Sequence, residues 1–446
     1  FVLPHGYPLE EHFATTPDGY ILRLFRLGSK GDAGAAAGRP VAFLQHPLMG
    51  SSVDYVVMGP GRSDPDDPAD APAFWGFSWD QHAALDLPAA LDYAAAASGQ
   101  ERAVFVGYSQ GTTIGLAALA SVPRVAARLT AAALLAPVAS VDYVVMGPGR
   151  SVAFMLADAG YDVWLTNVRG NRFSRNHTRL DPDDPADAPA FWGFSWDQHA
   201  ALDLPAALDY AAAASGQERA VFVGYSQGTT IGLAALASVP RVAARLTAAA
   251  LLAPVAFVTG MSSPLFRIMV TWRFDRLFRW AGMREYGRHI PRLAEAAAAF
   301  CGRHPAPCER YLFLMCGANP RGNLDRSLLP DVMRFLPSGT SVQNMEHWGQ
   351  EAYNSAVPPS YDLGSIATPL ALFSGGHDSL ADPGDVALLA AALQPRGAVR
   401  LHHFEPDYGH LDFGVGEDAA DRIYPALLNF LQQHTAAAVP GAAAAA

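Results

Sequence analysis

Three residue types that together transfer acyl groups occur in this sequence in the order serine, aspartate, histidine. Ser226 stands in the pentapeptide Gly-Tyr-Ser-Gln-Gly, Asp378 follows two glycines and one histidine, and His410 comes last. A serine hydroxyl attacks a carbonyl carbon efficiently when a base takes its proton and an acid orients that base. Taken singly, Asp378 could be a turn residue and His410 a loop histidine. Their order and spacing favour a nucleophile with its acid and base.

Each of the three residues directly follows a predicted strand. The apolar run 220–223 leads to Ser226, and small and apolar residues at helical spacing continue to residue 240. A strand, a sharp turn and a helix in this order are typical of the nucleophile elbow of α/β-hydrolases. Runs 369–373 and 399–404 predict strands that end just before Asp378 and His410. We therefore expect an α/β-hydrolase fold, with a mostly parallel central sheet flanked by helices.

Acyl transfer also requires N–H donors for the oxyanion that forms at the carbonyl oxygen. The residue after the nucleophile supplies one backbone N–H, which here is Gln227. The second donor should come from the loop after the early predicted strand 41–46, which makes Leu48 the candidate. We expect no cofactor and no metal ion in this chemistry.

Neighbouring carboxylates could compete with Asp378 as the acid. Asp407 and Asp412 lie beside the predicted histidine loop, and Asp382 and Asp385 follow Asp378. The last two stand toward a predicted helix start, where aspartate more often caps the helix.

Composition limits the class of protein. The chain has 446 residues, of which 50% are hydrophobic, and a formal net charge of −11. This balance argues against nucleic acid as a partner. Two uncharged runs, 220–240 and 246–266, contain polar residues or prolines and favour buried elements over transmembrane spans. The chain begins at Phe1 without a basic or long apolar leader, which indicates a removed signal peptide or a fragment.

An internal repeat complicates the serine motif. Residues 64–139 are identical to residues 181–256, and residues 53–63 are identical to residues 141–151, so Ser109 is a twin of Ser226. Residues 152–180, which contain a predicted strand at 162–168, occur only in the second copy. Solenoid repeats are divergent and numerous, whereas a perfect identity indicates a recent duplication or an error in the assembled gene.

The predicted strands and helices give a domain organisation. We expect an α/β core in residues 1–256 and 367–436, a mostly helical cap in residues 257–366, and a disordered tail in residues 437–446. The segment 53–140 is expected to be spurious or looped out of the core. The predicted core elements include a strand at 20–27, a strand at 246–255, a helix at 386–393 and a closing helix at 420–434.

The chain resembles the acid lipase family, which contains the gastric and lysosomal acid lipases and their plant and algal relatives. The matching stretches are residues 6–8, 15–22, 44–46, 157–165, 194–197, 203–206, 226–230, 252–256, 339–345, 347–348, 375–378, 380–383 and 410–413. Tyr225 stands where the family usually has His, and Pro47 where it usually has Gly. Between Trp348 and Tyr361 the chain is shorter than the family's.

The resemblance implies roles for individual residues. It implies Ser226 as nucleophile, Asp378 and His410 as its partners, and Leu48 and Gln227 as oxyanion donors. It also implies a lid within the cap, over an acyl-binding cleft. The three cysteines, all between positions 301 and 316, permit one local bridge, and the resemblance implies a Cys301–Cys308 disulfide with Cys316 free.

The same resemblance implies a monomeric lipase that cleaves triacylglycerols or sterol esters at a lipid–water interface, without a transmembrane segment. It implies a place in the secretory pathway, which fits the glycosylation sequon at Asn176. Two alternatives stay open: an inactive product of the duplication, and a soluble carboxylesterase for short acyl chains. Because only Ser226 follows the strand 162–168 and precedes the cap, we expect Ser226 rather than Ser109 to be the nucleophile.

Overall fold

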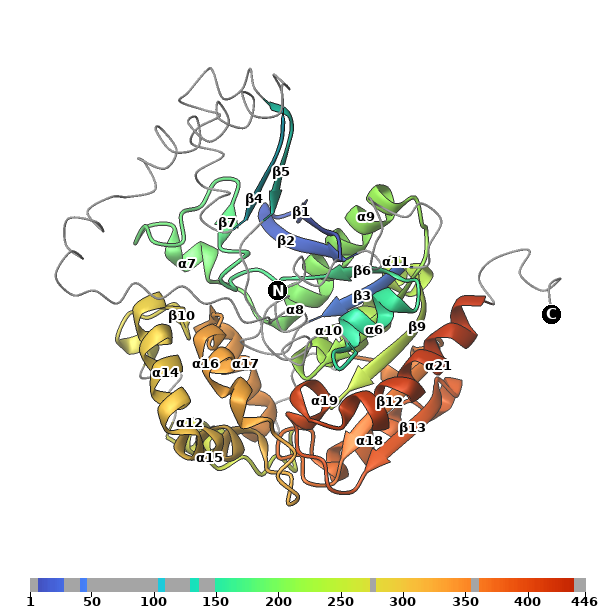
Figure 1. Cartoon of the computed structure of the whole chain (residues 1–446). Coiled ribbons are helices and arrows are strands. Elements are labelled where there is room, and N and C mark those ends of the chain that lie inside the picture. The colour runs from blue at the N-terminus through green and yellow to red at the C-terminus, as the bar shows by residue number, and fades with distance from the viewer. Residues whose placement is uncertain are drawn as a thin grey trace. The chain divides into compact units, whose positions relative to one another are not determined.

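A computed structural model describes residues 7–27, 41–45, 103–108, 129–135, 149–272, 278–353 and 361–436 (Figure 1). The chain forms two compact units, of which the smaller comprises Leu9–Glu11 and Gly59–Val138 and the larger comprises the rest. Within the described ranges, no helix is both long and apolar enough to cross a membrane. The predicted tail, residues 437–446, lies outside the described residues.

The central element is a nine-stranded sheet with the order β1-β2-β6-β3-β8-β9-β12-β13, in which β7 pairs with β2. Neighbouring strands from β6 to β13 run parallel, whereas β2 is antiparallel to β6 and β7. This arrangement confirms the predicted mostly parallel sheet. The strands are Leu9–Thr15 (β1), Tyr20–Leu27 (β2), Val41–Gln45 (β3), Asp162–Leu165 (β6), Asn176–His177 (β7), Ala220–Tyr225 (β8), Leu246–Leu252 (β9), Leu370–Gly375 (β12) and Val399–Glu405 (β13).

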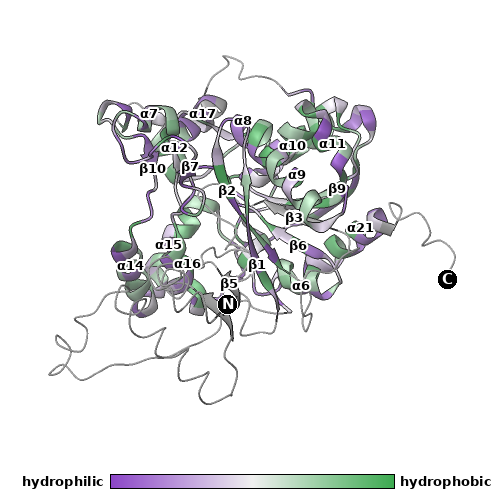
Figure 2. Cartoon of the chain, turned by 90° about the horizontal axis from the view of Figure 1, so that it is seen from above, coloured by the Kyte–Doolittle hydropathy of each residue, from purple (hydrophilic) through white to green (hydrophobic). Residues whose placement is uncertain are grey.

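Helices cover the sheet because alternate residues of its strands point to opposite faces. Trp164, Phe222 and Leu251 pack into one buried cluster with side chains of α9 and α10. Helices α6 and α21 contact β6 and β9 respectively, and they contact each other. Figure 2 shows green, hydrophobic residues on these helices and strands, with purple residues on the outer turns. The helices of the core are Val152–Asp158 (α6), Ala188–Phe191 (α7), Trp196–Gln198 (α8), Leu204–Ser215 (α9), Gln227–Ser238 (α10), Pro240–Arg245 (α11), Pro383–Ala392 (α18), Asp412–Val415 (α19), Ala419–Arg422 (α20) and Tyr424–Ala436 (α21).

Several predicted elements differ in extent from those observed. Strand β9 ends at Leu252 rather than at residue 255, and α18 begins at Pro383 rather than at residue 386. Strand β6 ends at Leu165 rather than Val168, because the following residues bond elsewhere: the side chain of Asn167 donates to the carbonyl of Arg23 and the backbone N–H of Arg169 to Asp203. The predicted closing helix is divided into α20 and α21. Pro425 lies in the first turn of α21, where a residue without a backbone N–H is tolerated. In the interior of one continuous helix, the same proline would remove a backbone hydrogen bond.

The repeat gives the same strands in both copies but different pairing. Ala103–Tyr108 (β4) and Leu129–Leu135 (β5) have the sequences of β8 and β9, and they pair in parallel with each other. They form a two-stranded sheet, whereas β8 and β9 also pair with β3 and β12 in the nine-stranded sheet. The identical sequence therefore determines the local strands, and the surrounding chain determines which copy enters the large sheet.

A buried ion pair ties the sheet to α9. The guanidinium of Arg169, whose side chain is 1% exposed, donates to Asp203 at 2.7 Å and to Asp18 at 2.6 Å. Its charge lies 3.9 Å from the centre of the Tyr20 ring, within the range of a cation–π contact. Burial raises the pKa of Asp203, and the charge of Arg169 opposes this rise.

The described residues between 257 and 366, which are called the cap below, are mostly helical. The cap helices lie together in Figure 1 in yellow and orange, and the short strands Glu285–Tyr286 (β10) and Thr340–Ser341 (β11) pair between them. This strand pair was not predicted, because two-residue strands have no detectable periodicity. The helices are Pro264–Thr271 (α12), Pro291–Arg303 (α14), Pro305–Cys316 (α15), Leu329–Phe335 (α16) and Val342–Tyr353 (α17).

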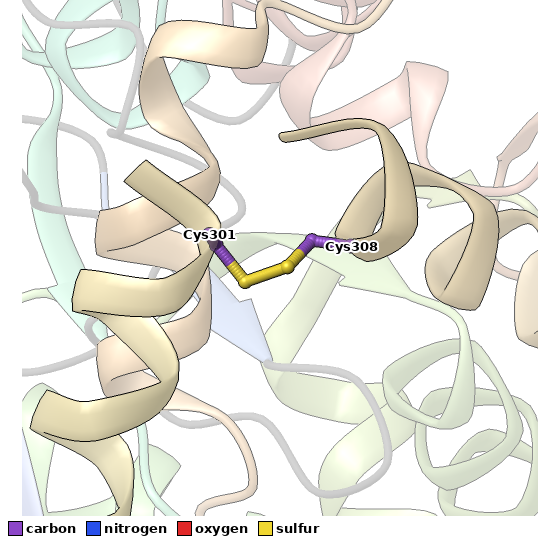
Figure 3. Close-up of a disulfide and its surroundings, with 2 residues drawn as sticks. All are labelled: Cys301 and Cys308. Atoms are coloured by element: carbon purple, nitrogen blue, oxygen red, sulfur yellow. A yellow bond between two sulfur atoms is a disulfide. The ribbon is translucent and has the colours of Figure 1, made fainter. Parts of the chain in front are cut away.

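The cap contains the disulfide that the family resemblance implied. Cys301 in α14 is bonded to Cys308 in α15, with 5.7 Å between their Cα atoms (Figure 3). Both cysteines are buried, and Cys316 is not part of a disulfide. The bridge joins two consecutive helices across their short connection.

Candidate active site

Ser226 occupies a sharp turn between β8 and α10. Its φ of 53° and ψ of −124° are unusual, because a side chain rarely tolerates positive φ. Among the described non-glycine residues, only Ala253 shares this feature. The turn is fixed on both sides: the N–H of Ser226 donates to the carbonyl of Leu252 and its carbonyl accepts from Thr229. A strained serine held between a strand and a helix has the geometry of a nucleophile elbow.

Gly224 permits the close approach of strand and helix at this turn. A Cβ atom at position 224 would lie 2.9 Å from the carbonyl oxygen of Gly228 and 2.7 Å from the ring of Phe222. Neither distance is compatible with a side chain. Position 224 therefore requires glycine.

Asp378 and His410 are paired, as the sequence predicts. The Nδ1 atom of His410 lies 2.8 Å from Oδ2 and 3.0 Å from Oδ1 of Asp378. The carboxylate also accepts from the backbone N–H groups of Leu380 at 2.9 Å and Ala381 at 2.8 Å. Both side chains are buried, so water does not weaken the pair.

Glycines bring the aspartate loop and the histidine loop together. A Cβ atom on Gly375 would lie 2.3 Å from the carbonyl oxygen of Tyr408, and one on Gly376 would lie 2.2 Å from that of Pro406. The N–H of His377 donates to the carbonyl of Tyr408 at 2.9 Å. Because β12 and β13 are parallel neighbours, the two loops leave the same edge of the sheet.

The histidine loop also contacts the elbow. Tyr225, the residue before Ser226, donates its hydroxyl proton to the carbonyl of His410 at 2.8 Å. The two rings stack with centroids 5.2 Å apart and an angle of 25°. The Nε2 atom of His410 is buried, and within the described part of the chain it has no hydrogen-bond partner. With Nδ1 held by Asp378, Nε2 is the nitrogen left to exchange a proton.

The competing carboxylates have other partners. Asp382 caps α18 by accepting from the N–H of Gly384, as expected for an aspartate at a helix start. Asp385 accepts from Thr259 and Gly260, and Asp407 pairs with Arg321. Asp412 accepts from the N–H of Gly409 at 2.6 Å and from the side chain of Asn323 at 3.0 Å. Burial raises the pKa of Asp412 to about 6.

Of the two expected oxyanion donors, one is described. Gln227 is the first residue of α10, where a backbone N–H has no acceptor within its own helix. Leu48 lies outside the described residues, and so does the twin serine Ser109. Asn176, the predicted glycosylation site, is exposed in β7.

Several contacts at the site were not predicted from the sequence. Tyr225 differs from the usual His of the family, and no signal in the sequence indicates its bond to His410. The carbonyl of Cys316 accepts from the N–H groups of Ser379 and His410, so the end of α15 contacts both loops. Asn344 and Trp348 of α17 contact the side chain of Gln227. Their spacing of four residues places them on one helix face and could have indicated a shared target.

Comparisons with known proteins agree with this fold. A family model described as "alpha/beta hydrolase fold" matches residues 150–417, and one described as "partial alpha/beta-hydrolase lipase region" matches residues 1–59. A solved structure of a protein from Sulfolobus solfataricus has a TM-score of 0.50 at 13% identity, covering 93% of this chain and 90% of its own. That likeness concerns the fold alone.

Curated relatives identify the family. Human lipase member K is 30% identical over 96% of this chain and 89% of its own length, and mouse gastric triacylglycerol lipase gives the same values. Human lysosomal acid lipase/cholesteryl ester hydrolase is 35% identical over 66% of this chain and 77% of its own length. The chain therefore belongs to the acid lipase family of α/β-hydrolases.

Proposed function

We propose that this chain hydrolyses the carboxylic esters of lipids through an acyl-enzyme formed on Ser226. The observation that carries the proposal is the buried Asp378–His410 pair, whose histidine contacts the elbow that holds Ser226. The relatives named as triacylglycerol lipase and cholesteryl ester hydrolase support lipid esters as the substrate class.

The proposed reaction has two halves. Ser226 Oγ attacks the ester carbonyl carbon while Nε2 of His410 takes the hydroxyl proton. The carboxylate of Asp378 stabilises the resulting imidazolium through Nδ1, and the N–H groups of Gln227 and Leu48 donate to the oxyanion. His410 then gives the proton to the departing alcohol. Water attacks the acyl-enzyme by the same route, which releases the fatty acid and restores Ser226.

The pairing of the repeated strands supports Ser226 over Ser109 as the nucleophile. Strand β8, which leads to Ser226, and its neighbour β9 belong to the same sheet as β12 and β13. Strands β12 and β13 lead to Asp378 and His410. The strands of the other copy pair with each other. Only one Asp378 and one His410 exist to serve both serines.

Side-by-side replacement of the two serines tests the proposal. We expect Ser226→Ala to lower kcat by about 10⁴- to 10⁶-fold and Ser109→Ala to leave it unchanged. Labelling the serine would not distinguish them, because the surrounding sequences are identical. Near-full activity in Ser226→Ala would refute the assignment, and an inactive wild-type chain would favour the alternative of an inactive duplication product.

The intact mass of the native protein tests the repeat itself. A mass near 47.3 kDa supports a chain that contains both copies. A mass lower by residues 53–140 would show that this segment is absent from the natural protein. We propose a core in residues 1–256 and 367–436 with a cap between them. If residues 53–140 are absent, only the first part of this core becomes shorter.

Lipid and soluble substrates distinguish a lipase from a carboxylesterase. A lipase rate should rise when a partly soluble ester such as tributyrin passes its solubility limit and forms an emulsion. A rate that saturates below that limit would favour the soluble carboxylesterase.

We also propose a monomer in the secretory pathway, because the relatives include gastric and lysosomal lipases and Asn176 is exposed. Loss of mass after treatment with a glycosidase, in wild type but not in Asn176→Gln, would support this location. Light scattering would test the monomer.

A further inference from the structure

The side chain of Gln227 is held by the cap. Its Oε1 atom accepts from the indole Nε1 of Trp348 at 2.8 Å and from Nδ2 of Asn344 at 3.0 Å. Gln227 and Asn344 are buried and Trp348 is partly buried. Oε1 has two lone pairs, so these two donors occupy its full capacity as an acceptor.

Both donors come from one face of α17. Residues four apart in a helix lie one above the other, so Asn344 and Trp348 reach the same atom without distortion of the helix. Asn344 has further bonds: its N–H donates to Ser341 Oγ at 2.9 Å and its Nδ2 to Thr340 Oγ1 at 3.1 Å. The donors are therefore fixed in position before they contact Gln227.

Helix α17 is itself anchored to the core beside the elbow. The ring of His347 stacks on Trp196 of α8, with centroids 4.4 Å apart and an angle of 12°. The hydroxyl of Tyr361 donates to Asp197 of the same helix at 2.6 Å. Burial lowers the pKa of His347, which favours the neutral imidazole in this stack. The stack on Trp196 and the bonds to Gln227 thus fix residues 344–348 of α17 relative to α8 and the first turn of α10, and Tyr361 holds the chain beyond the end of the helix.

We propose that Trp348 and Asn344 are positioning residues that set the direction of the Gln227 backbone N–H. The inference rests on the proposed function, in which this N–H donates to the oxyanion. The peptide unit between Ser226 and Gln227 carries that N–H. Thr229 holds the carbonyl of this unit through its N–H at 2.9 Å and its hydroxyl at 2.6 Å, whereas the N–H of Gln227 has no acceptor within the helix. Holding the side chain of Gln227 from the cap restricts rotation at this residue. The cap then contributes to transition-state stabilisation.

The test removes the indole donor while keeping an aromatic ring. Trp348→Phe should lower kcat on a soluble short-chain p-nitrophenyl ester about tenfold, with KM changed less than about twofold, since a misplaced oxyanion donor affects the transition state. The matched control is Trp192→Phe, which also loses one buried indole bond, at 3.1 Å to the carbonyl of Pro182. The control should lose thermal stability to a similar degree and keep wild-type kcat.

A thionoester substrate separates positioning from general structural damage. Replacing the carbonyl oxygen by sulfur weakens the bonds from oxyanion donors, so the wild-type enzyme should strongly prefer the oxygen ester. Trp348→Phe should reduce this preference by several-fold, and Trp192→Phe should leave it unchanged. A kcat and an ester-to-thionoester ratio of wild-type size in Trp348→Phe would overturn the proposal.

The same bond can be tested from its other side. Gln227→Met keeps the backbone N–H and the length of the side chain but removes the acceptor, and it should match Trp348→Phe in both readouts. Combining the two variants should add little, because each removes the same interaction. Fully additive losses of kcat would contradict the proposal, and Gln227→Met remains informative if Trp348→Phe does not fold.

Ser226→Ala distinguishes failure of this inference from failure of the proposed function. If Ser226→Ala stays active, both the proposed function and the positioning role are wrong. If Ser226→Ala is inactive while Trp348→Phe and Gln227→Met keep full kcat, only the positioning role is wrong.

Discussion

The phenol of Tyr225 donates a hydrogen bond of 2.8 Å to the carbonyl oxygen of His410, and its ring stacks on the imidazole. This relationship links the turn before Ser226 directly to the loop after β13. Both residues are buried, so the contact is shielded from water. The ring holds one face of the imidazole, and Asp378 holds its Nδ1 edge. One contact at the ring face and one at the ring edge leave little freedom for the orientation of His410.

Removing the phenolic hydroxyl should loosen this orientation. Tyr225→Phe keeps the stacked ring but leaves the His410 carbonyl without this donor, at a cost of about 1 kcal/mol in the free energy of unfolding. We expect kcat on a soluble ester to fall roughly three- to tenfold, because a general base must lie within hydrogen-bond reach of its proton. Steady-state kinetics and urea unfolding measure the two effects. Tyr20→Phe, which loses a buried bond to the Phe191 carbonyl, should lose stability and keep kcat.

Asp412 should make stability depend on pH in the acidic range. Its pKa is raised by burial from 3.8 to about 6, so the folded protein binds this proton more tightly than the unfolded chain does. The stabilisation is complete below about pH 4 and is lost as the pH rises through 6, a change on the order of 3 kcal/mol. Comparing urea unfolding of wild type and Asp412→Asn from pH 4 to pH 7 isolates this group. Parallel pH profiles for the two proteins would contradict the prediction.

Arg169 should be one of the most sensitive positions for stability. Arg169→Met leaves the fully buried carboxylate of Asp203 without its charge partner, which should cost about 3–5 kcal/mol. Adding Asp203→Asn should recover much of this loss, because the amide oxygen can still accept from the N–H of residue 169. Denaturant midpoints of the single and double variants measure the difference. A double variant as unstable as Arg169→Met would show that the charge on Asp203 is not the cause.

The Cys301–Cys308 bridge should stabilise the cap locally. Closing this short loop should contribute roughly 2–3 kcal/mol by restricting the unfolded chain. In Cys308→Ser, we expect faster hydrogen exchange in α14 and α15 and unchanged exchange in β8 and β12. Cys316→Ser is the matched control, since Cys316 is not part of the disulfide and its contact with the site uses a backbone carbonyl. Equal exchange in wild type and Cys308→Ser would refute the prediction.

Much of the core was predictable because buried strands and an elbow have local signatures. The runs that contain β8, β12 and β13 are apolar and end at chemistry-bearing residues, and the structure places Asp378 beside His410 accordingly. The end of β6 was not predictable in this way. Asn167 and Arg169 leave the sheet to bond with Arg23 and Asp203, which are distant in sequence.

The contacts around the candidate site could not be predicted from the sequence, because they join residues that lie far apart in it. The bond from Tyr225 to His410 spans 185 positions, and those from α17 to Gln227 span 117 and 121. Such pairs depend on how the cap packs on the core, and no periodicity within a single segment encodes that packing. The residues of α17 matched the family resemblance, yet a match alone assigns no physical role.

The repeated segment places one amino-acid sequence in two different structural settings within the same chain. β4 and β8 have the same sequence, so their intrinsic exchange chemistry is the same, but β8 lies between β3 and β9 whereas β4 pairs with β5. A peptide from residues 220–225 has the same mass as the peptide from residues 103–108. In hydrogen exchange of the full chain followed by mass spectrometry, the two should therefore appear as one peptide whose isotope envelope has two components. A two-stranded sheet is marginal by itself. The separation between the components would therefore measure what long-range packing adds to backbone protection when the local sequence is held constant.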